Sequence, residues 1–125
     1  IWSTACMAFE LATCDYLFEQ EEDDDETAHE AALLAKMTVL LGPIPTQVFA
    51  SGSQWNTFFN RQGKLLHVSD DVHEEEPYTL MERLVLEYDW SYNDAANFSS
   101  FLTPMLELVP ANRSTAAQSV QHEWL

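Results

Sequence analysis

The sequence predicts an all-α fold, and three features of its apolar pattern support this prediction. Residues 1–13 carry apolar side chains on nearly every side of a helical wheel, which is typical of a helix buried all round. Residues 29–41 and 78–106 place apolar side chains at spacings of three and four, the pattern of helices with one buried face. The expected architecture is therefore a central buried helix with the later helices packed around it.

The first helix is followed by a connection and an acidic run. Asp15-Tyr16-Leu17-Phe18 is expected to be a short link whose aromatic rings pack back on the fold. Residues 19–26 are all polar and mostly carry the same charge. Because like charges repel and these side chains bury nothing, we expect a mobile, solvated acidic loop there.

The next helix has clear start and stop signals. Thr27-Ala28-His29-Glu30 matches a capping box, in which the Thr hydroxyl and the Glu carboxylate bond the free amides of a helix start. Gly42-Pro43 ends the helix, because Pro cannot continue it and Gly tolerates a left-handed cap. Residues 44–77 are predicted to be mostly loop, with one short helix near Trp55.

The last third of the chain predicts further helices. The first spans residues 78–88, and Ser91 to Asp94 then resembles a capped start, with Asp in place of the usual Glu. Pro104 is expected to bend the following helix near its end. Ser114 or Thr115 is expected to cap a final short helix that continues to Trp124.

Composition and charge exclude several classes of function. The chain has 21 acidic and 5 basic residues and a formal charge of −16, a field that repels nucleic-acid phosphate and attracts cationic partners. No apolar run is long enough for a membrane helix. Cys6 and Cys14 lie about two helical turns apart, roughly 12 Å, which is too far for a disulfide and indicates a reducing compartment.

Common catalytic and metal-binding patterns do not occur in the sequence. Its 3 glycines are isolated, so there is no phosphate loop. Its 4 histidines lack zinc-site spacing. The acidic run lacks the alternating ligands and central Gly of an EF-hand loop. No serine lies in a nucleophile elbow. We therefore expect no catalytic residue, no cofactor-binding residue and no metal ligand in this chain.

Several longer strings occur in an order that resembles a known family. They are residues 1–13 (IWSTACMAFELAT), 15–19 (DYLFE), 40–45 (LLGPIP), 58–65 (FFNRQGKL), 101–108 (FLTPMLEL), 113–117 (RSTAA) and 122–125 (HEWL). Together they resemble the C-lobe of the SR-protein-specific serine/threonine kinases, from its central helix to its last helix. The resemblance spans essentially the whole chain, so residues 1–125 are interpreted as a partial protein kinase domain.

The resemblance implies a function for the longer protein to which such a segment would belong. The parent kinase would transfer phosphate from ATP, with Mg, to serines of arginine/serine-rich splicing factors, and it would act in the cytoplasm and nucleus. Its Gly-rich loop, strand lysine, His-Arg-Asp loop and Asp-Phe-Gly site are not in this sequence. The expected partners are therefore arginine/serine-rich proteins and the missing N-terminal part of the kinase domain, and the chain alone should be inactive.

The resemblance also assigns roles to individual residues. Asp15 matches a carboxylate of the acidic groove that docks arginine-rich substrates. Arg113 resembles the arginine that pairs with the Glu of an Ala-Pro-Glu motif, which this chain lacks, and Trp2 belongs to the central helix; both are expected to be structural. The sequence departs from the family pattern at five positions: Ala32 and Val39 replace groove acids, Glu87 replaces a lysine, and Cys14 and Glu123 replace a glycine and a proline.

Two interpretations remain open at this point. The chain could be part of an SR-protein kinase, supplying scaffold and substrate docking. It could instead be a noncatalytic acidic helical module, a truncated or degenerate kinase copy that only binds basic proteins. The acidic residues 21–26 could compensate for the replaced groove acids or could simply form a solvated loop.

Overall fold

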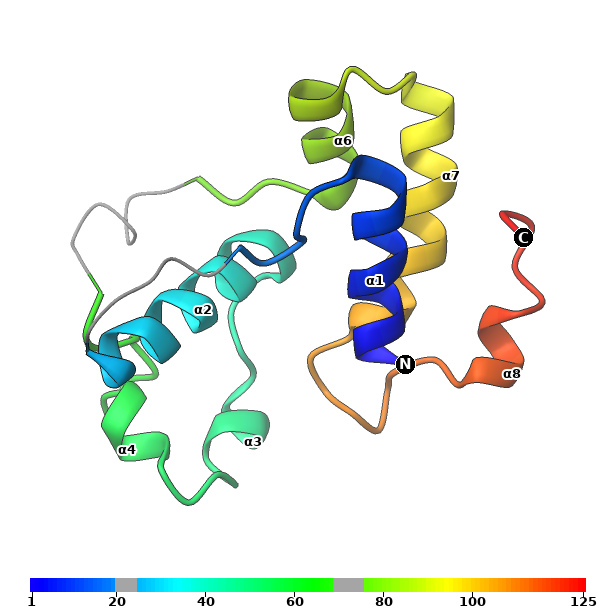
Figure 1. Cartoon of the computed structure of the whole chain (residues 1–125). Helices are drawn as coiled ribbons and strands as arrows, with labels where there is room; N and C mark the ends of the chain where they lie inside the picture. The colour runs from blue at the N-terminus through cyan, green and yellow to red at the C-terminus, as the bar shows by residue number, and fades with distance from the viewer. Residues whose placement is uncertain (20–24, 69–75) are drawn as a thin grey trace. The chain divides into compact units, whose positions relative to one another are not determined.

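The computed structural model describes residues 1–19, 25–68 and 76–125, and its regular elements in these ranges are helical (Figure 1). They are α1 (Trp2–Thr13), α2 (Glu26–Leu41), α3 (Thr46–Phe49), α4 (Trp55–Phe58), α6 (Leu80–Tyr88), α7 (Tyr92–Leu102), the 3₁₀ helix η1 (Thr103–Leu106) and α8 (Ala116–Ser119). Within the same ranges the extended pairing is an isolated bridge between Phe59 and Leu65. The all-α prediction is therefore confirmed.

The chain divides into two compact units. Unit 1 consists of residues 1–17 and 78–125, and unit 2 consists of residues 18–77. In unit 1, α6 and α7 pack against each other, and η1 contacts both α1 and α7. The largest fully buried side chains all belong to unit 1: Phe9, Leu84, Phe98, Leu102, Met105 and Leu106.

Helix α1 is buried on one side. Ala5 and Phe9 are fully buried, whereas Met7 and Leu11 are 55% and 78% exposed. The apolar wheel predicted burial on all sides, but a helix is covered only where another element packs on it, and in unit 1 that is the side of Phe9. The α1 boundaries agree with the predicted ones to within one residue.

Helix capping explains where the remaining helices of unit 1 begin. The Ser91 hydroxyl accepts the Asp94 amide at the start of α7, as predicted from the sequence. Of the two predicted caps for α8, the structure uses Thr115, in a capping box with Gln118. Helix α6 begins with a capping box between Thr79 and Glu82, which the sequence analysis did not identify.

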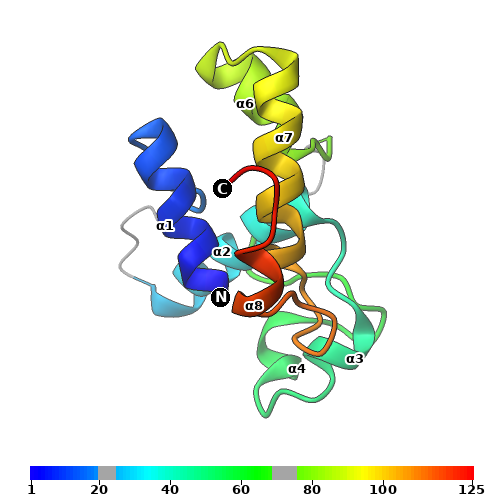
Figure 2. The same ribbon diagram turned by 90° about the vertical axis from the view of Figure 1, so that its right-hand side faces the viewer.

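Two helix ends in unit 1 are set by local chemistry. Pro104 lies in the second position of η1, so the α-helical pattern of α7 tightens to a 3₁₀ turn there, as expected for the predicted bend. Helix α8 ends at Ser119 rather than at the predicted Trp124. After α8 the chain continues as a coil to the C-terminus (Figure 2). The Trp124 ring in this coil stacks on Trp90 with centroids 6.3 Å apart and packs at a tilt on Phe98 with centroids 4.8 Å apart.

The start of α2 differs from the predicted one. Asp25 is the N-cap, and its carboxylate accepts the amides of Thr27 and Ala28. The predicted capping box of Thr27 and Glu30 is therefore wrong, because an ionised carboxylate two residues earlier bonds the free amides more strongly than a hydroxyl. Of the predicted acidic loop, Glu26 belongs to α2, and residues 20–24 lie outside the described residues.

Unit 2 is held together by an aromatic group next to a tight turn. Phe49 stacks on Phe59 at 4.6 Å and approaches Trp55 at 6.4 Å. The turn ends at Gly63, whose φ of +80° favours glycine, and a Cβ there would lie 3.3 Å from the Phe49 ring. This turn brings Leu65 back beside Phe59.

Candidate functional site

The candidate site of unit 1 is built at the end of α1. Cys14 caps the helix in a left-handed conformation, with φ 62° and ψ 22°. This sharp turn directs the next residue, Asp15, away from the helix and places it at the surface. The Thr13 hydroxyl accepts the Asp15 amide at 3.3 Å and donates to the Phe9 carbonyl at 2.9 Å, which fixes the backbone of the turn.

The Asp15 carboxylate is oriented by two hydrogen bonds. Its Oδ1 accepts the amide of Tyr16 at 3.0 Å, and its Oδ2 accepts the hydroxyl of Tyr88 at 3.2 Å. Tyr88 is the last residue of α6, and its ring meets buried Phe9 edge-on with centroids 5.7 Å apart. The carboxylate is thus exposed to solvent but held by groups that are anchored in the core of unit 1.

Arg83 joins the same elements from the inner side. Its Nη1 donates to the Leu17 carbonyl at 2.7 Å, and its Nε donates to Glu87 Oε2 at 2.9 Å. The guanidinium carbon lies 5.2 Å from the centre of the Phe9 ring. Arg83 therefore ties the segment after α1 to α6, and its positive charge is already paired with Glu87.

Two side chains of this network have shifted pKa values. For Arg83, burial opposes the charge, but the hydrogen bond and attraction of Glu87 outweigh it, so the pKa of Arg83 is raised. Burial raises the pKa of Tyr88; Arg83 opposes this effect, while the hydrogen bond to Asp15 and the charges of Asp15 and Glu87 add to it. Tyr88 thus remains a hydrogen-bond donor beyond the usual tyrosine pKa of about 10.

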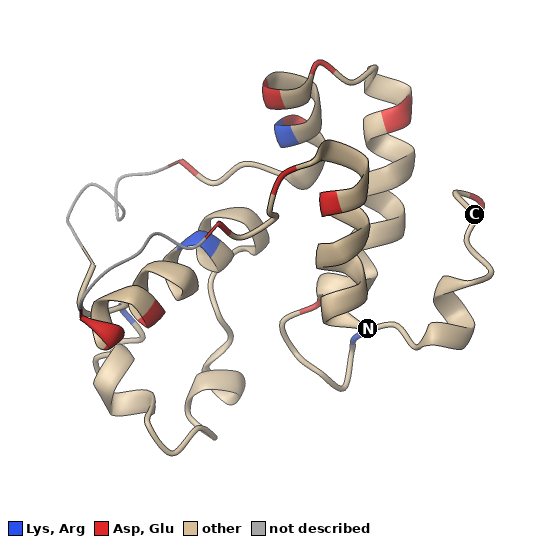
Figure 3. Ribbon diagram, viewed as in Figure 1, with Lys and Arg blue, Asp and Glu red and all other residues tan. Residues whose placement is uncertain are grey.

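The electrostatic balance of unit 1 favours a cationic ligand. Its acidic residues outnumber its two arginines (Figure 3). Arg83 is paired with Glu87. The Arg113 guanidinium lies over the Trp2 ring at 5.0 Å, and its Nε donates to the Glu107 carbonyl at 2.9 Å. A carboxylate such as Asp15 therefore meets no unpaired arginine within unit 1.

The structure brings together the two residues predicted to be structural. The contact between Arg113 and Trp2 joins the start of α1 to the segment after η1. The next amide, that of Ser114, donates to the Pro104 carbonyl at 2.9 Å, which holds this segment against η1. Ala32 and Val39, where the resemblance implies groove acids, lie on α2 in unit 2, and Val39 is buried.

Sequence reasoning missed the groups that support Asp15. It noted Glu87 only as a departure from the family, and it assigned no role to Arg83 or Tyr88. Arg83 and Glu87 lie four residues apart on α6, a spacing at which oppositely charged side chains pair. That signal is visible in the sequence. The contact of Tyr88 with Asp15 joins residues 73 positions apart, and no local pattern predicts it.

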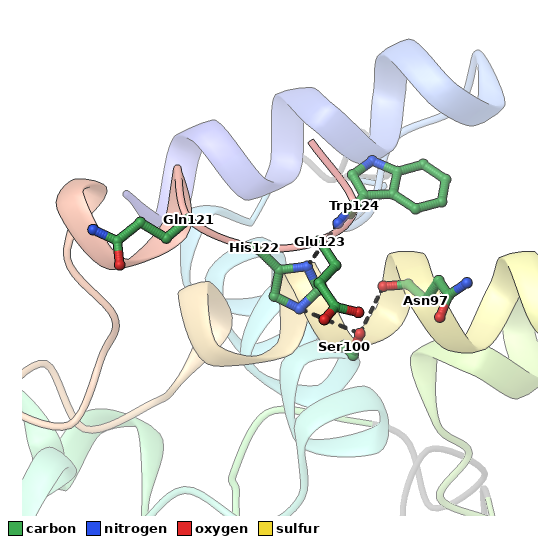
Figure 4. Close-up of a pocket in the computed structure, with 6 residues that line it drawn as sticks. All are labelled: Asn97, Ser100, Gln121, His122, Glu123 and Trp124. Atoms are coloured by element: carbon green, nitrogen blue, oxygen red, sulfur yellow. Dashed lines mark hydrogen bonds between the residues drawn. The ribbon is translucent and has the colours of Figure 1, made fainter.

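A polar pocket of about 450 Å³ lies near the C-terminus (Figure 4). Its lining residues are Asn97, Ser100, Gln121, His122, Glu123 and Trp124. His122 Nδ1 accepts the Trp124 amide at 3.2 Å, so in the neutral ring the proton is on Nε2, which faces the Ser100 hydroxyl at 3.4 Å.

This hydrogen-bond pattern does not fit a nucleophilic serine. Ser100 donates its proton to the Asn97 carbonyl at 2.7 Å, and His122 presents a donor rather than a base to it. Among the described residues, no group of three or more His, Cys, Asp or Glu side chains could hold a metal ion. No helix in the described ranges is long and apolar enough to cross a membrane.

Comparison with known proteins finds relatives over the entire chain. No protein-family model matches the sequence. The chain is 46% identical over 125 residues to serine/threonine-protein kinase spk-1 of Caenorhabditis elegans, and 46% identical over 125 residues to SRSF protein kinase 3 of Homo sapiens. It is 38% identical over 125 residues to serine/threonine-protein kinase SKY1 of Saccharomyces cerevisiae.

All three matches cover 100% of this chain but only 12%, 21% and 16% of the respective relatives. The chain therefore spans a small part of the length of these kinases. Its helical fold agrees with the C-lobe of a kinase domain. With 46%, 46% and 38% identity over all 125 of its residues to these three kinases, the chain belongs to the SR-protein-specific serine/threonine kinase family.

Proposed function

We propose that residues 1–125 form part of the C-lobe of a serine/threonine kinase that phosphorylates arginine/serine-rich splicing factors with ATP and Mg. The segment contributes scaffold and a docking site for the arginine-rich part of the substrate. The observation that carries this proposal is the Asp15 carboxylate, which is exposed, oriented by Tyr88 and free of competing arginine. Similarity of all 125 residues to part of a protein named SRSF protein kinase 3 supports the choice of substrate.

The docking strength of the segment is expected to be modest. Exposed ion pairs contribute about 0–1 kcal/mol each, and micromolar affinity needs about 8 kcal/mol. At the family's groove positions on α2 this chain has Ala32 and Val39. Both side chains are uncharged, and Val39 lines a small pocket with Ile44 and Phe59 instead.

A titration with an arginine/serine-repeat peptide tests the docking proposal. Asp15→Ala should weaken binding by several-fold at low salt. Glu10→Ala is the matched control, because Glu10 is an exposed carboxylate of the same unit and its removal changes the net charge equally. Equal losses from the two substitutions would show nonspecific attraction by the acidic field and would overturn the assignment of Asp15.

The noncatalytic acidic module is the second candidate, and the apolar Val39 in place of a groove acid favours it. The two candidates predict different results for a chimera in which this chain replaces the matching segment of human SRSF protein kinase 3. A chimera that phosphorylates an arginine/serine peptide at a rate near that of the human kinase supports the kinase assignment. A folded chimera that binds ATP and peptide without turnover supports the binding module.

A further inference from the structure

We infer that Tyr88 is a positioning residue that makes the Asp15 site selective for arginine over lysine. This inference rests on the docking role proposed for Asp15. It concerns a different property, namely how the carboxylate is presented and which cation it prefers. It follows from the hydrogen bonds of Asp15 and from the anchoring of the Tyr88 ring.

The hydrogen bonds leave Asp15 one free acceptor position on each oxygen. A carboxylate has about four lone-pair positions. Tyr16 occupies one on Oδ1, and Tyr88 occupies one on Oδ2. The remaining pair, one on each oxygen, matches the two parallel N–H groups of a guanidinium fork. A lysine ammonium is a compact point charge and gains little from such a fixed pair of acceptors.

The Tyr88 hydroxyl fixes the plane of the carboxylate because the ring itself cannot move freely. The ring packs edge-on against Phe9, which is fully buried, and it lies at the end of α6. Arg83 fastens that helix to the Leu17 carbonyl, only two residues after Asp15. Without the hydroxyl, the exposed carboxylate would rotate about its terminal torsion and present a paired fork only part of the time.

Glu87 keeps the positive charge of Arg83 from opposing a bound guanidinium. The Arg83 side chain is 14% exposed and its Nε donates to Glu87. An unpaired guanidinium at this depth would repel a second one at Asp15, since screening by solvent is weak there. The site thus combines one oriented acceptor with a neutralised neighbour, which is the arrangement a second arginine requires.

The test uses the 125-residue chain and two peptides of equal length, an arginine/serine repeat and a lysine/serine repeat, in calorimetric titrations. Tyr88→Phe removes only the hydroxyl, and loss of one hydrogen bond of typical strength at an exposed site should weaken arginine-peptide binding roughly fivefold. Lysine-peptide binding should change little, so the arginine preference falls. Tyr92→Phe is the control, since Tyr92 is 70% exposed on the same unit.

A double substitution separates positioning from structural damage. In an Asp15→Ala background, Tyr88→Phe should have no further effect on arginine-peptide binding, because the two side chains act through one hydrogen bond. Circular dichroism verifies that each variant is folded. Tyr88→Phe could weaken binding of both peptides equally, or could weaken arginine-peptide binding in the Asp15→Ala background as much as in the wild-type chain. Either result would mean a structural role and would overturn the inference.

The same data distinguish this inference from the docking proposal. If Asp15→Ala leaves arginine-peptide affinity unchanged, Asp15 is not the docking residue and the positioning role fails with it. If Asp15→Ala weakens binding but Tyr88→Phe leaves the preference for arginine unchanged, docking stands and only the role of Tyr88 is wrong.

Discussion

At the scale of single residues, the end of α1 shows a side chain in a conformation that suits glycine. Cys14 adopts φ 62° and ψ 22° to complete the cap of the helix. For a residue with a Cβ, this left-handed conformation costs about 1–2 kcal/mol, and glycine avoids that cost. A cysteine in this conformation therefore lowers the stability of the turn beside Asp15.

Replacing Cys14 by glycine should stabilise unit 1. We expect Cys14→Gly to raise the free energy of unfolding by about 1 kcal/mol. The gain is smaller than the full cost of the left-handed conformation, because glycine also increases the conformational entropy of the unfolded chain. Cys14→Ala is the control, because it removes the thiol but keeps the Cβ, and it should leave the stability nearly unchanged. Urea unfolding followed by circular dichroism measures both values. An equal gain from both variants would trace the effect to the thiol instead.

Ser99 provides a second residue-scale test. Its side chain is 8% exposed, and its hydroxyl has no hydrogen-bond partner among the described residues. An unsatisfied buried hydroxyl costs about 1–3 kcal/mol, and alanine is also a better helix former. Ser99→Ala should therefore raise the midpoint of urea unfolding. Ser100→Ala, which breaks the hydrogen bond to the Asn97 carbonyl, should lower it or leave it unchanged.

At the scale of elements, two helix starts offer a matched comparison. Thr79 caps α6 in a box with Glu82, and Thr115 caps α8 in a box with Gln118. The backbone and side-chain hydrogen bonds of Thr79 hold the pKa of Glu82 below its usual value. A lowered folded-state pKa contributes stability above the unfolded value, about 4.3, and that contribution is lost as the pH falls through the folded value.

The two caps should therefore differ in their response to acid. At pH 7, Thr79→Ala should cost about 1 kcal/mol of stability. This cost should shrink between pH 5 and pH 3, roughly the range around the usual glutamate pKa, as Glu82 becomes protonated in the wild-type chain. Thr115→Ala should show a cost that does not change over that range, because Gln118 does not titrate. A parallel decline for both variants would exclude Glu82 as the cause.

The helix boundaries show which local signals the sequence reports well. Ser91 and Pro104 act within a turn of their own positions, so the start of α7 and its change to η1 were predictable. At α2 two candidate caps compete, and the carboxylate of Asp25 prevails over the hydroxyl of Thr27. The N-cap preference ranks Asp above Thr, in agreement with the observed start of α2. At α6 the Thr79 and Glu82 pair forms a capping box within a single turn, a signal of the same local kind.

The candidate site was predictable only in part, for a different reason. Asp15 was identified by family resemblance, but its support comes from α6, far along the chain. Such contacts depend on how helices pack, which apolar periodicity does not specify. The same limit explains α1, whose apolar wheel predicted burial on every side although Met7 and Leu11 are largely exposed. Periodicity shows which faces are apolar but not which neighbours cover them.

At the scale of the whole molecule, the first expectation concerns activity. The 125-residue sequence contains none of the motifs that position ATP, magnesium and the acceptor hydroxyl in kinases. The chain by itself should neither bind Mg-ATP nor phosphorylate an arginine/serine peptide. A radiolabelled-phosphate assay with human SRSF protein kinase 3 as positive control measures this directly. Turnover well above a no-protein control would contradict the expectation.

The second whole-molecule property is the net charge of −16, which should make salt act in opposite directions on folding and on binding. Like charges on a compact chain repel, and the screening length falls from about 30 Å at 0.01 M salt to about 8 Å at 0.15 M. Over this range the Tm of the free chain should rise by about 4 °C, equivalent to about 1 kcal/mol. Affinity for an arginine/serine peptide should fall, because the same ions screen the attraction between the acidic chain and the peptide.

Lowering the pH provides the internal control for this effect. Near pH 4.5, close to the ordinary pKa values of Asp and Glu, the net negative charge is smaller, so the repulsion is weaker and the same salt increase should raise the Tm much less. Thermal scans at both pH values, together with titrations at both salt concentrations, separate charge screening from a general effect of salt on apolar burial. A salt-induced rise in Tm of equal size at pH 7 and pH 4.5 would show that self-repulsion does not limit the stability of this chain. Weaker peptide binding at high salt would then reflect local pairs such as the one at Asp15, not the acidic field as a whole.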